Sequence, residues 1–136
     1  MIVTFISPIN NKNMSKPPIY LNLLKIQLPI AGVSSITHRV SAIGIFILLL
    51  PFLFLLFLAV NSESGFDLVS YYFEMTFVKV FFNLLIAGLT YHFISGIRHL
   101  VMDFGYWGTL EAGRNSAIGT FVVSFILLFI FTTILW

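Results

Sequence analysis

Two histidines and an arginine interrupt a long apolar stretch of the chain. His92, Arg98 and His99 all fall within residues 77–101, which are otherwise long and apolar enough to cross a bilayer. An ionisable group at bilayer depth is costly unless it is paired, so such residues are functional candidates by default. A neutral imidazole in an apolar pocket suits an axial ligand of haem iron. A histidine that only hydrogen-bonds a neighbouring helix is the alternative for His92, and depth alone does not decide between them.

The spacing of the histidines limits how they could bind one haem. His92 and His99 are two helical turns apart and therefore share a helix face, whereas two axial ligands must approach the iron from opposite sides. His38 is expected near the inner membrane boundary, which makes it a poor partner for a more deeply buried His92. A second axial ligand is therefore expected from another chain. Gly88 and Gly96 have no side chains on the helix face that carries His92, so either a flat macrocycle or another helix could approach this face closely.

A second polar cluster is expected at the inner membrane boundary, where the start of the first span and the end of the second meet. Its members are Ser34, Ser35, His38, Arg39, Arg98, His99 and Asp103. The presence of either arginine by itself would be explained by snorkelling, in which the long side chain extends along the helix to place its charge in the membrane interface. As a pocket, the cluster offers arginine and histidine to carboxylates such as haem propionates. It also offers a serine hydroxyl and an arginine that could polarise a quinone carbonyl, with histidines and a carboxylate to supply protons.

The composition identifies the class of protein that must hold these residues. Of the 136 residues, 59% are hydrophobic and only 9% are charged, against about 25% charged residues in a soluble domain. The chain is therefore a membrane protein. The absence of cysteine excludes disulfides, thiolate metal sites and cysteine nucleophiles within this chain. A net charge of +2 is too small and too dispersed to indicate nucleic-acid binding.

Three stretches meet the length of about 20 residues that a helix needs to cross the hydrocarbon core. They are residues 40–60, 77–101 and 116–136, and they form a predicted anchor domain over residues 36–136. Residues 1–35 are polar or punctuated by proline and glycine, and are expected to include a segment lying in the membrane interface. The predicted fold class is an all-α membrane protein with three transmembrane helices, bundled with a partner subunit.

The lysines and arginines set the predicted orientation. Six of the seven fall on the N-terminal side of the membrane, and only Lys79 falls on the other. The six are Lys12, Lys16, Lys25, Arg39, Arg98 and Arg114. The positive-inside rule then places the N-terminus and the second loop inside and the C-terminus outside.

Two motifs carry a resemblance to a known family. Residues 35–41 (SITHRVS) resemble the S-x-x-H-R-x-S/T-G signature of the cytochrome b subunit of succinate dehydrogenase, and residues 91–105 (YHFISGIRHLVMDFG) resemble its H-x-x-x-G-x-R-H-L-x-x-D signature. Residues 17–21 (PPIYL) and 111–114 (EAGR) are also similar to that family, so the resemblance covers nearly the whole chain. Ala42 departs from the glycine of the first signature, which tightens a helix contact and affects no candidate functional residue.

The resemblance implies a membrane anchor of respiratory complex II in a bacterial or mitochondrial inner membrane, with its N-terminus on the cytoplasmic or matrix side. Such an anchor pairs with a second small anchor subunit, shares one haem b with it, and docks an iron–sulfur subunit and a flavoprotein. By motif position, His92 would ligate the haem iron, and His38, Arg39 and His99 would lie near the propionates. Ser35 and Arg39 would line the ubiquinone pocket, with Asp103 a weaker candidate.

Three other functions remain as alternatives. The anchor of a quinol:fumarate reductase would run the same chemistry in reverse. A structural anchor without a redox role would need none of the histidines. A small channel or transporter is disfavoured, because the polar residues gather at one boundary and form no stripe through the bilayer.

Overall fold

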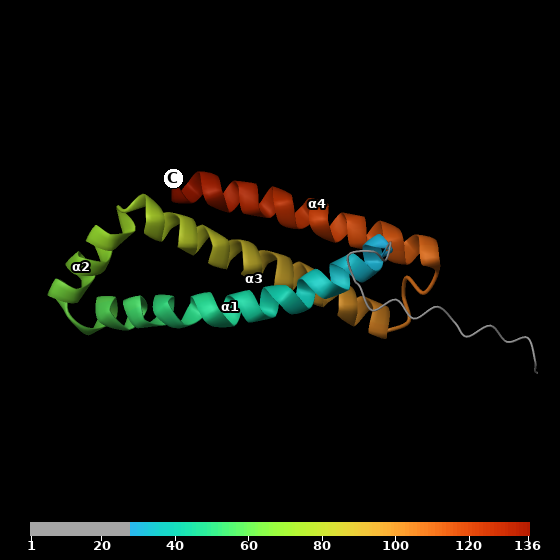
Figure 1. Ribbon diagram of the computed structural model, residues 1–136, viewed down its shortest axis with the longest axis horizontal. Helices are drawn as coiled ribbons and strands as arrows, with labels where there is room; N and C mark the ends of the chain where they lie inside the picture. The colour runs from blue at the N-terminus through green and yellow to red at the C-terminus, as the bar shows by residue number, and fades with distance from the viewer. Residues whose placement is uncertain (1–27) are drawn as a thin grey trace, which may run out of the picture.

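Residues 28–136 are described by the computed structural model, and they form four α-helices. These are α1 (Ile30–Asn61), α2 (Glu63–Phe73), α3 (Thr76–Asp103) and α4 (Leu110–Leu135). Figure 1 shows the three long helices lying along one another, with α2 turning the chain between α1 and α3. No strand occurs within residues 28–136. The predicted all-α architecture is thus confirmed.

The three long helices overlap the three predicted spans, and each begins before its predicted first residue. By length and composition, α1, α3 and α4 are each able to cross a membrane. α1 begins at Ile30 rather than near residue 40, and its 32 residues correspond to about 48 Å of helix, longer than a ~30 Å hydrocarbon core. Hydropathy marks the apolar centre of a helix, whereas the helix itself continues through polar residues such as Ser34 and Ser35. Of the predicted interfacial segment, residues 1–27 lie outside the described part.

The short helix α2 was not predicted. Its 11 residues begin after Ser62, whose side chain accepts a hydrogen bond from the Gly65 amide as an N-cap. Phe73 at its end packs against Phe52 of α1 and Phe82 of α3, at ring-centroid distances of 6.2 and 5.3 Å. A helix this short depends on such tertiary contacts for its stability. The predicted spans are apolar stretches of about 20 residues, and α2 is too short to meet that length.

The antiparallel arrangement gathers the termini of the long helices into two ends. One end holds the start of α1, the end of α3 and the start of α4, and we call it the histidine end (Figure 1). The opposite end holds α2 and the C-terminus, where Lys79 Nζ lies 5.8 Å from the centre of the Trp136 ring. The expectation that the start of the first span meets the end of the second is therefore confirmed.

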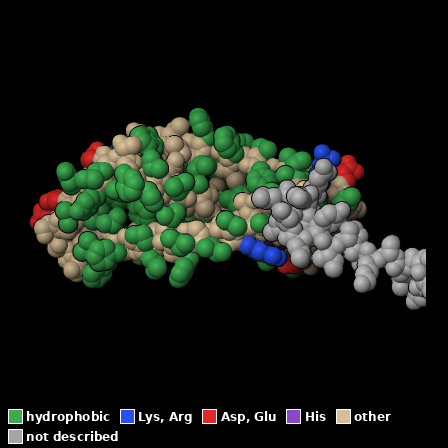
Figure 2. Space-filling view, in the orientation of Figure 1, with side chains coloured by type: hydrophobic (Ala, Val, Ile, Leu, Met, Phe, Trp, Pro, Cys, Tyr) green, Lys and Arg blue, Asp and Glu red, His purple; other side chains and the backbone are tan. Residues whose placement is uncertain are grey.

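The interior of this bundle is more polar than its surface. The buried polar residues in the described chain are Ser34, Ser95, Arg98, Thr120 and Ser124, whereas the buried apolar ones are Val69, Leu85, Tyr91 and Ala117. Large apolar side chains cover the outside, and Figure 2 shows charged groups only toward the two ends of the visible face. Small hydroxyl residues between helices with hydrocarbon outside are typical of membrane helices, where lipid tails replace water.

One buried contact ties α1 to α3 near the histidine end. The Tyr91 hydroxyl donates to the Ser34 carbonyl at 2.9 Å, and Ser34 Oγ lies 3.1 Å from the same phenol oxygen. The Tyr91 ring also stacks on Phe121 of α4, with centroids 5.3 Å apart. This tyrosine therefore contacts both neighbouring helices and fixes their register beside His92.

We expect Tyr91→Phe to lower the free energy of unfolding by about 1 kcal/mol, because it removes the hydroxyl and leaves the stacked ring in place. The unfolding midpoint of the protein purified in detergent, followed by circular dichroism, measures this. Tyr72→Phe, which alters an exposed tyrosine of α2, is the matched control. Equal midpoints for Tyr91→Phe and the wild type would contradict the role given to the hydroxyl.

Candidate functional site

All three histidines of the chain meet in one cluster at the histidine end. The His38 ring of α1 stacks on the His92 ring of α3 with centroids 4.1 Å apart and planes 15° from parallel. The His99 ring lies 5.0 Å from that of His38 and is tilted by 45°. His92 and His99 therefore both reach the face of α3 that packs on α1, as their spacing predicted.

The expected separation of His38 from His92 is wrong. It rested on placing His38 near the inner membrane boundary, just before a first span that starts near residue 40. Because α1 begins at Ile30 and runs antiparallel to α3, His38 instead lies inside the helix and opposite His92. The stacked geometry still argues against two ligands from this pair, since two parallel rings in contact leave no room for a macrocycle between them.

The protonation of His92 follows from its contacts with α1. Its Nδ1 lies 3.2 Å from the His38 carbonyl oxygen, which can only accept a hydrogen bond, so Nδ1 carries the proton. Ser41 Oγ lies 3.1 Å from the same nitrogen and donates its own proton to the His38 carbonyl at 2.7 Å. Nε2 consequently keeps its lone pair, and it forms no hydrogen bond within residues 28–136. A held Nδ1–H with a free Nε2 is the arrangement of a metal-ligating histidine.

His38 presents a second nitrogen without a protein partner. Its Nε2 is buried and makes no hydrogen bond within the described residues. A Cβ added at Gly96 would lie 3.8 Å from this atom, an ordinary van der Waals distance, so His38 packs closely on α3 at this glycine. A buried ring nitrogen left unpaired in an apolar setting calls for an external polar group.

The remaining predicted site residues lie at the same end, but their side chains form no hydrogen bond with the histidines within residues 28–136. Arg39 and Asp103 are exposed and Ser35 is partly buried. No hydrogen bond joins any of the three to the cluster among residues 28–136. They therefore form an open polar rim around the histidine end rather than a closed pocket.

Arg98 belongs to a different part of the structure from the histidine cluster. It is only 4% exposed, and its hydrogen bonds run to α4. Nε donates to Ser116 Oγ at 3.0 Å and Nη2 donates to the Gly113 carbonyl at 3.2 Å. The predicted inner polar cluster is thus divided, with Arg98 facing α4 and the histidines between α1 and α3.

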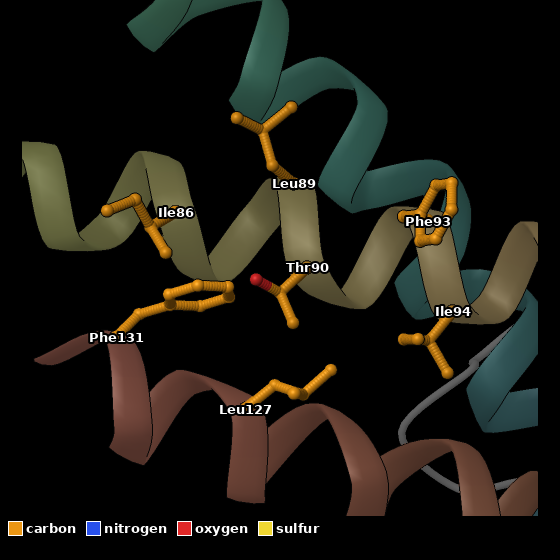
Figure 3. A pocket seen from close by; sticks show the side chains of 7 residues that line it. All are labelled: Ile86, Leu89, Thr90, Phe93, Ile94, Leu127 and Phe131. Carbon is orange, nitrogen blue, oxygen red and sulfur yellow. The ribbon is translucent and has the colours of Figure 1, made fainter.

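The chain also has an apolar groove between α3 and α4 of about 570 Å³. Figure 3 shows Leu127 and Phe131 of α4 extending toward Ile86 and Thr90 of α3. Thr90 is the one polar side chain among those lining it. This groove offers no group for acid–base or electron-transfer chemistry, so the histidine cluster remains the candidate site.

Two supporting residues were not singled out in advance. Ser41 is one turn beyond His38 on α1, and Tyr91 directly precedes His92. A serine three residues after a histidine on a helix could have indicated Ser41 as a supporting residue, because both side chains lie on one helix face. The partner of Tyr91 depends on how α1 and α3 pack, which no local pattern specifies.

Comparison with known proteins gives a consistent result. Residues 13–131 match the family model described as succinate dehydrogenase/fumarate reductase transmembrane subunit. A succinate dehydrogenase cytochrome b556 subunit from Coxiella burnetii is 33% identical over 124 residues, covering 90% of this chain and 98% of that protein.

Two cytochrome b560 subunits of succinate dehydrogenase are similarly related. The subunit from Reclinomonas americana is 33% identical over 138 residues, covering 96% of this chain and 91% of that protein. The subunit from Chondrus crispus is 31% identical over 96 residues, covering 68% and 76% respectively.

Proposed function

This chain belongs to the succinate dehydrogenase/fumarate reductase transmembrane subunit family, and from that premise we propose that it binds haem b through His92 and helps to form a ubiquinone-reduction site. The observation that carries the proposal is the His92 ring, which α1 holds through Nδ1 and whose Nε2 has no hydrogen-bond partner among residues 28–136. Its relatives are named cytochrome b subunits, and the donor set here fits such a group. When bound, haem b supplies one-electron redox chemistry.

The second axial ligand is proposed to come from a partner anchor subunit. His38 is stacked against His92 and His99 follows on the same helix face, so neither can approach an iron from the side opposite His92. The chain contains no other histidine. The chain exposes many large apolar side chains. Part of this apolar surface would pack against the second small anchor, and the remaining part would face lipid.

His38, Arg39 and His99 are proposed to hold the haem propionates. The buried Nε2 of His38, which has no hydrogen-bond partner among residues 28–136, supports this role. Arg39 adds a charge that hydrogen-bonds carboxylates strongly. These side chains would hold the carboxylates of the group, and His92 of the same cluster would hold its iron.

Ubiquinone reduction is proposed at the same end. Arg39 lies about one helical turn after Ser35 on α1, and the side chains of both residues are at least partly exposed at the histidine end. The serine hydroxyl and the guanidinium would donate hydrogen bonds to a quinone carbonyl oxygen as negative charge develops on it. Asp103 is the weaker candidate, as a proton donor at the rim.

The assembly that this implies follows from the family. An iron–sulfur subunit and a flavoprotein would dock at the histidine end, which the charge pattern places on the cytoplasmic or matrix side of an inner membrane. Succinate would be oxidised in the flavoprotein, since this chain has neither cysteine nor a nucleotide-binding motif. The family also includes fumarate reductase anchors, but the relatives compared above are all named succinate dehydrogenase, which favours the succinate-oxidising direction.

We expect Ser41→Ala to raise the midpoint potential of the haem, by on the order of tens of millivolts, because an acceptor on the ligand Nδ1–H makes the imidazole more basic and favours the oxidised iron. Redox titration of the assembled complex, followed by absorption, measures the shift. Ser64→Ala, an exposed serine of α2, is the control. An unchanged potential in Ser41→Ala would contradict the role of this hydrogen bond.

Arg39→Leu should lower succinate–ubiquinone reductase activity by roughly tenfold to a hundredfold, while electron transfer from succinate to a soluble artificial acceptor persists. The reason is that the guanidinium is proposed to serve the quinone and the haem propionates, and electron transfer to the soluble acceptor needs neither. Arg114→Leu removes another exposed arginine near the same end and should spare both activities. Equal loss of both activities in Arg39→Leu would point to failed assembly and remove the support for a quinone role.

A further inference from the structure

Arg98 is a buried cation without an anionic partner. Its hydrogen bonds end on a hydroxyl and a backbone carbonyl, both neutral, and it forms no salt bridge within residues 28–136. Residues 1–27 contain no aspartate or glutamate that could pair with it. A buried charge is strongly unfavourable when nothing compensates it, so an anion from outside the chain is expected nearby.

Arg98 lines a groove that opens on the outside of the α3–α4 pair. The groove has a volume of about 290 Å³ and is lined by Ile94, Ile97, Arg98, Trp107, Ser116, Gly119, Thr120 and Val123. It is distinct from the histidine cluster, which lies between α1 and α3, and from the apolar groove of Figure 3, with which it shares only Ile94.

The loop between α3 and α4 carries an unusual backbone at the mouth of this groove. Trp107 has a φ of 58°, a left-handed conformation that non-glycine residues seldom adopt, and Gly105 precedes it with a φ of 86°. The turn brings Trp107 into the groove lining while leaving its side chain 43% exposed. Tryptophan is enriched at the headgroup level of membranes, where one part of the ring is apolar and the other is wet.

The polarity of the groove changes along its length. Arg98, Ser116 and Trp107 lie toward the histidine end, whereas Ile94 and Val123 lie deeper along α3 and α4. A cationic head with apolar walls behind it matches a phospholipid, whose phosphate sits at the interface and whose acyl chains enter the hydrocarbon. A free inorganic anion would gain nothing from the apolar walls.

We propose that this groove binds an anionic phospholipid, with the phosphodiester paired to Arg98 and the start of an acyl chain along Ile94, Ile97 and Val123. The guanidinium geometry suits phosphate oxygens. The proposal depends on the chain crossing a membrane, but not on haem or quinone binding. Haem content can therefore be read separately in every preparation described below.

Two variants test the site by different means. Arg98→Gln removes the charge but keeps a hydrogen-bond donor for α4. Gly119→Leu fills the groove, and a Cβ at Gly119 meets no atom within 4 Å, so the helix itself accommodates the change. Gly119→Leu leaves Arg98 and its hydrogen bonds intact. If Arg98→Gln fails to assemble, Gly119→Leu therefore still tests whether the groove binds a phospholipid.

The matched controls are Arg114→Gln, which removes an exposed arginine of α4, and Ile118→Phe, which adds bulk beside Gly119 outside the groove. Each complex is purified from membranes, and its retained phospholipid is identified by native mass spectrometry. Each is also placed in nanodiscs of phosphatidylcholine with or without phosphatidylglycerol, and its thermal midpoint is recorded. Inorganic phosphate is titrated as a separate probe.

We expect the wild type and both controls to retain an anionic phospholipid and to gain thermal stability from phosphatidylglycerol. Arg98→Gln and Gly119→Leu should lose both effects while keeping the haem absorption of the wild type. Retention and stabilisation that are the same in all variants would overturn the proposal, as would equal stabilisation by inorganic phosphate. A wild type without retained lipid or phosphatidylglycerol dependence would also overturn it, and would assign the counter-charge to a carboxylate of a partner subunit.

Discussion

The antiparallel contact of α1 with α3 at the histidine end determines what this chain can do. There the His92 Nδ1–H meets the His38 carbonyl and Ser41 Oγ, and the Tyr91 hydroxyl meets Ser34, so that two adjacent residues of α3 are both held by α1. Shifting the register of the two helices by a single turn, about 5.4 Å, would break both connections together. Within residues 28–136, this register leaves Nε2 of His92 and Nε2 of His38 without hydrogen-bond partners and packs His38 against Gly96.

The membrane setting explains why the polar residues are inside. In water a bundle of this size would bury its large apolar side chains, whereas here they face outward and small hydroxyl residues pack between the helices. Small hydroxyl residues let the helix backbones approach closely, and the buried hydroxyls of Ser95 and Ser124 do so without a hydrogen-bond partner among residues 28–136. The same setting makes a buried cation such as Arg98 informative, because hydrocarbon offers it no counter-charge.

Much of the fold was predictable because it depends on composition and length. The three spans follow from apolar runs, and the shared face of His92 and His99 follows from helical periodicity. The contact of His38 with His92 was missed because hydropathy does not reveal that α1 starts at Ile30. The division of the polar cluster, with Arg98 bonded to α4, depends on helix packing that no local pattern encodes. The roles of Ser35, Arg39 and Asp103 stay predictions, since they require groups beyond this chain.

The central claim is that His92 ligates a haem whose other ligand lies on a partner subunit. The most direct measurement is the dithionite-reduced minus oxidised absorption spectrum of the assembled complex, comparing wild type with His92→Ala and with His38→Ala. The account predicts a b-type haem signal in the wild type that is lost or strongly shifted in His92→Ala. In His38→Ala the signal should persist, because His38 is proposed to contact a propionate and not the iron. Identical spectra for wild type and His92→Ala, with the complex intact, would contradict the account.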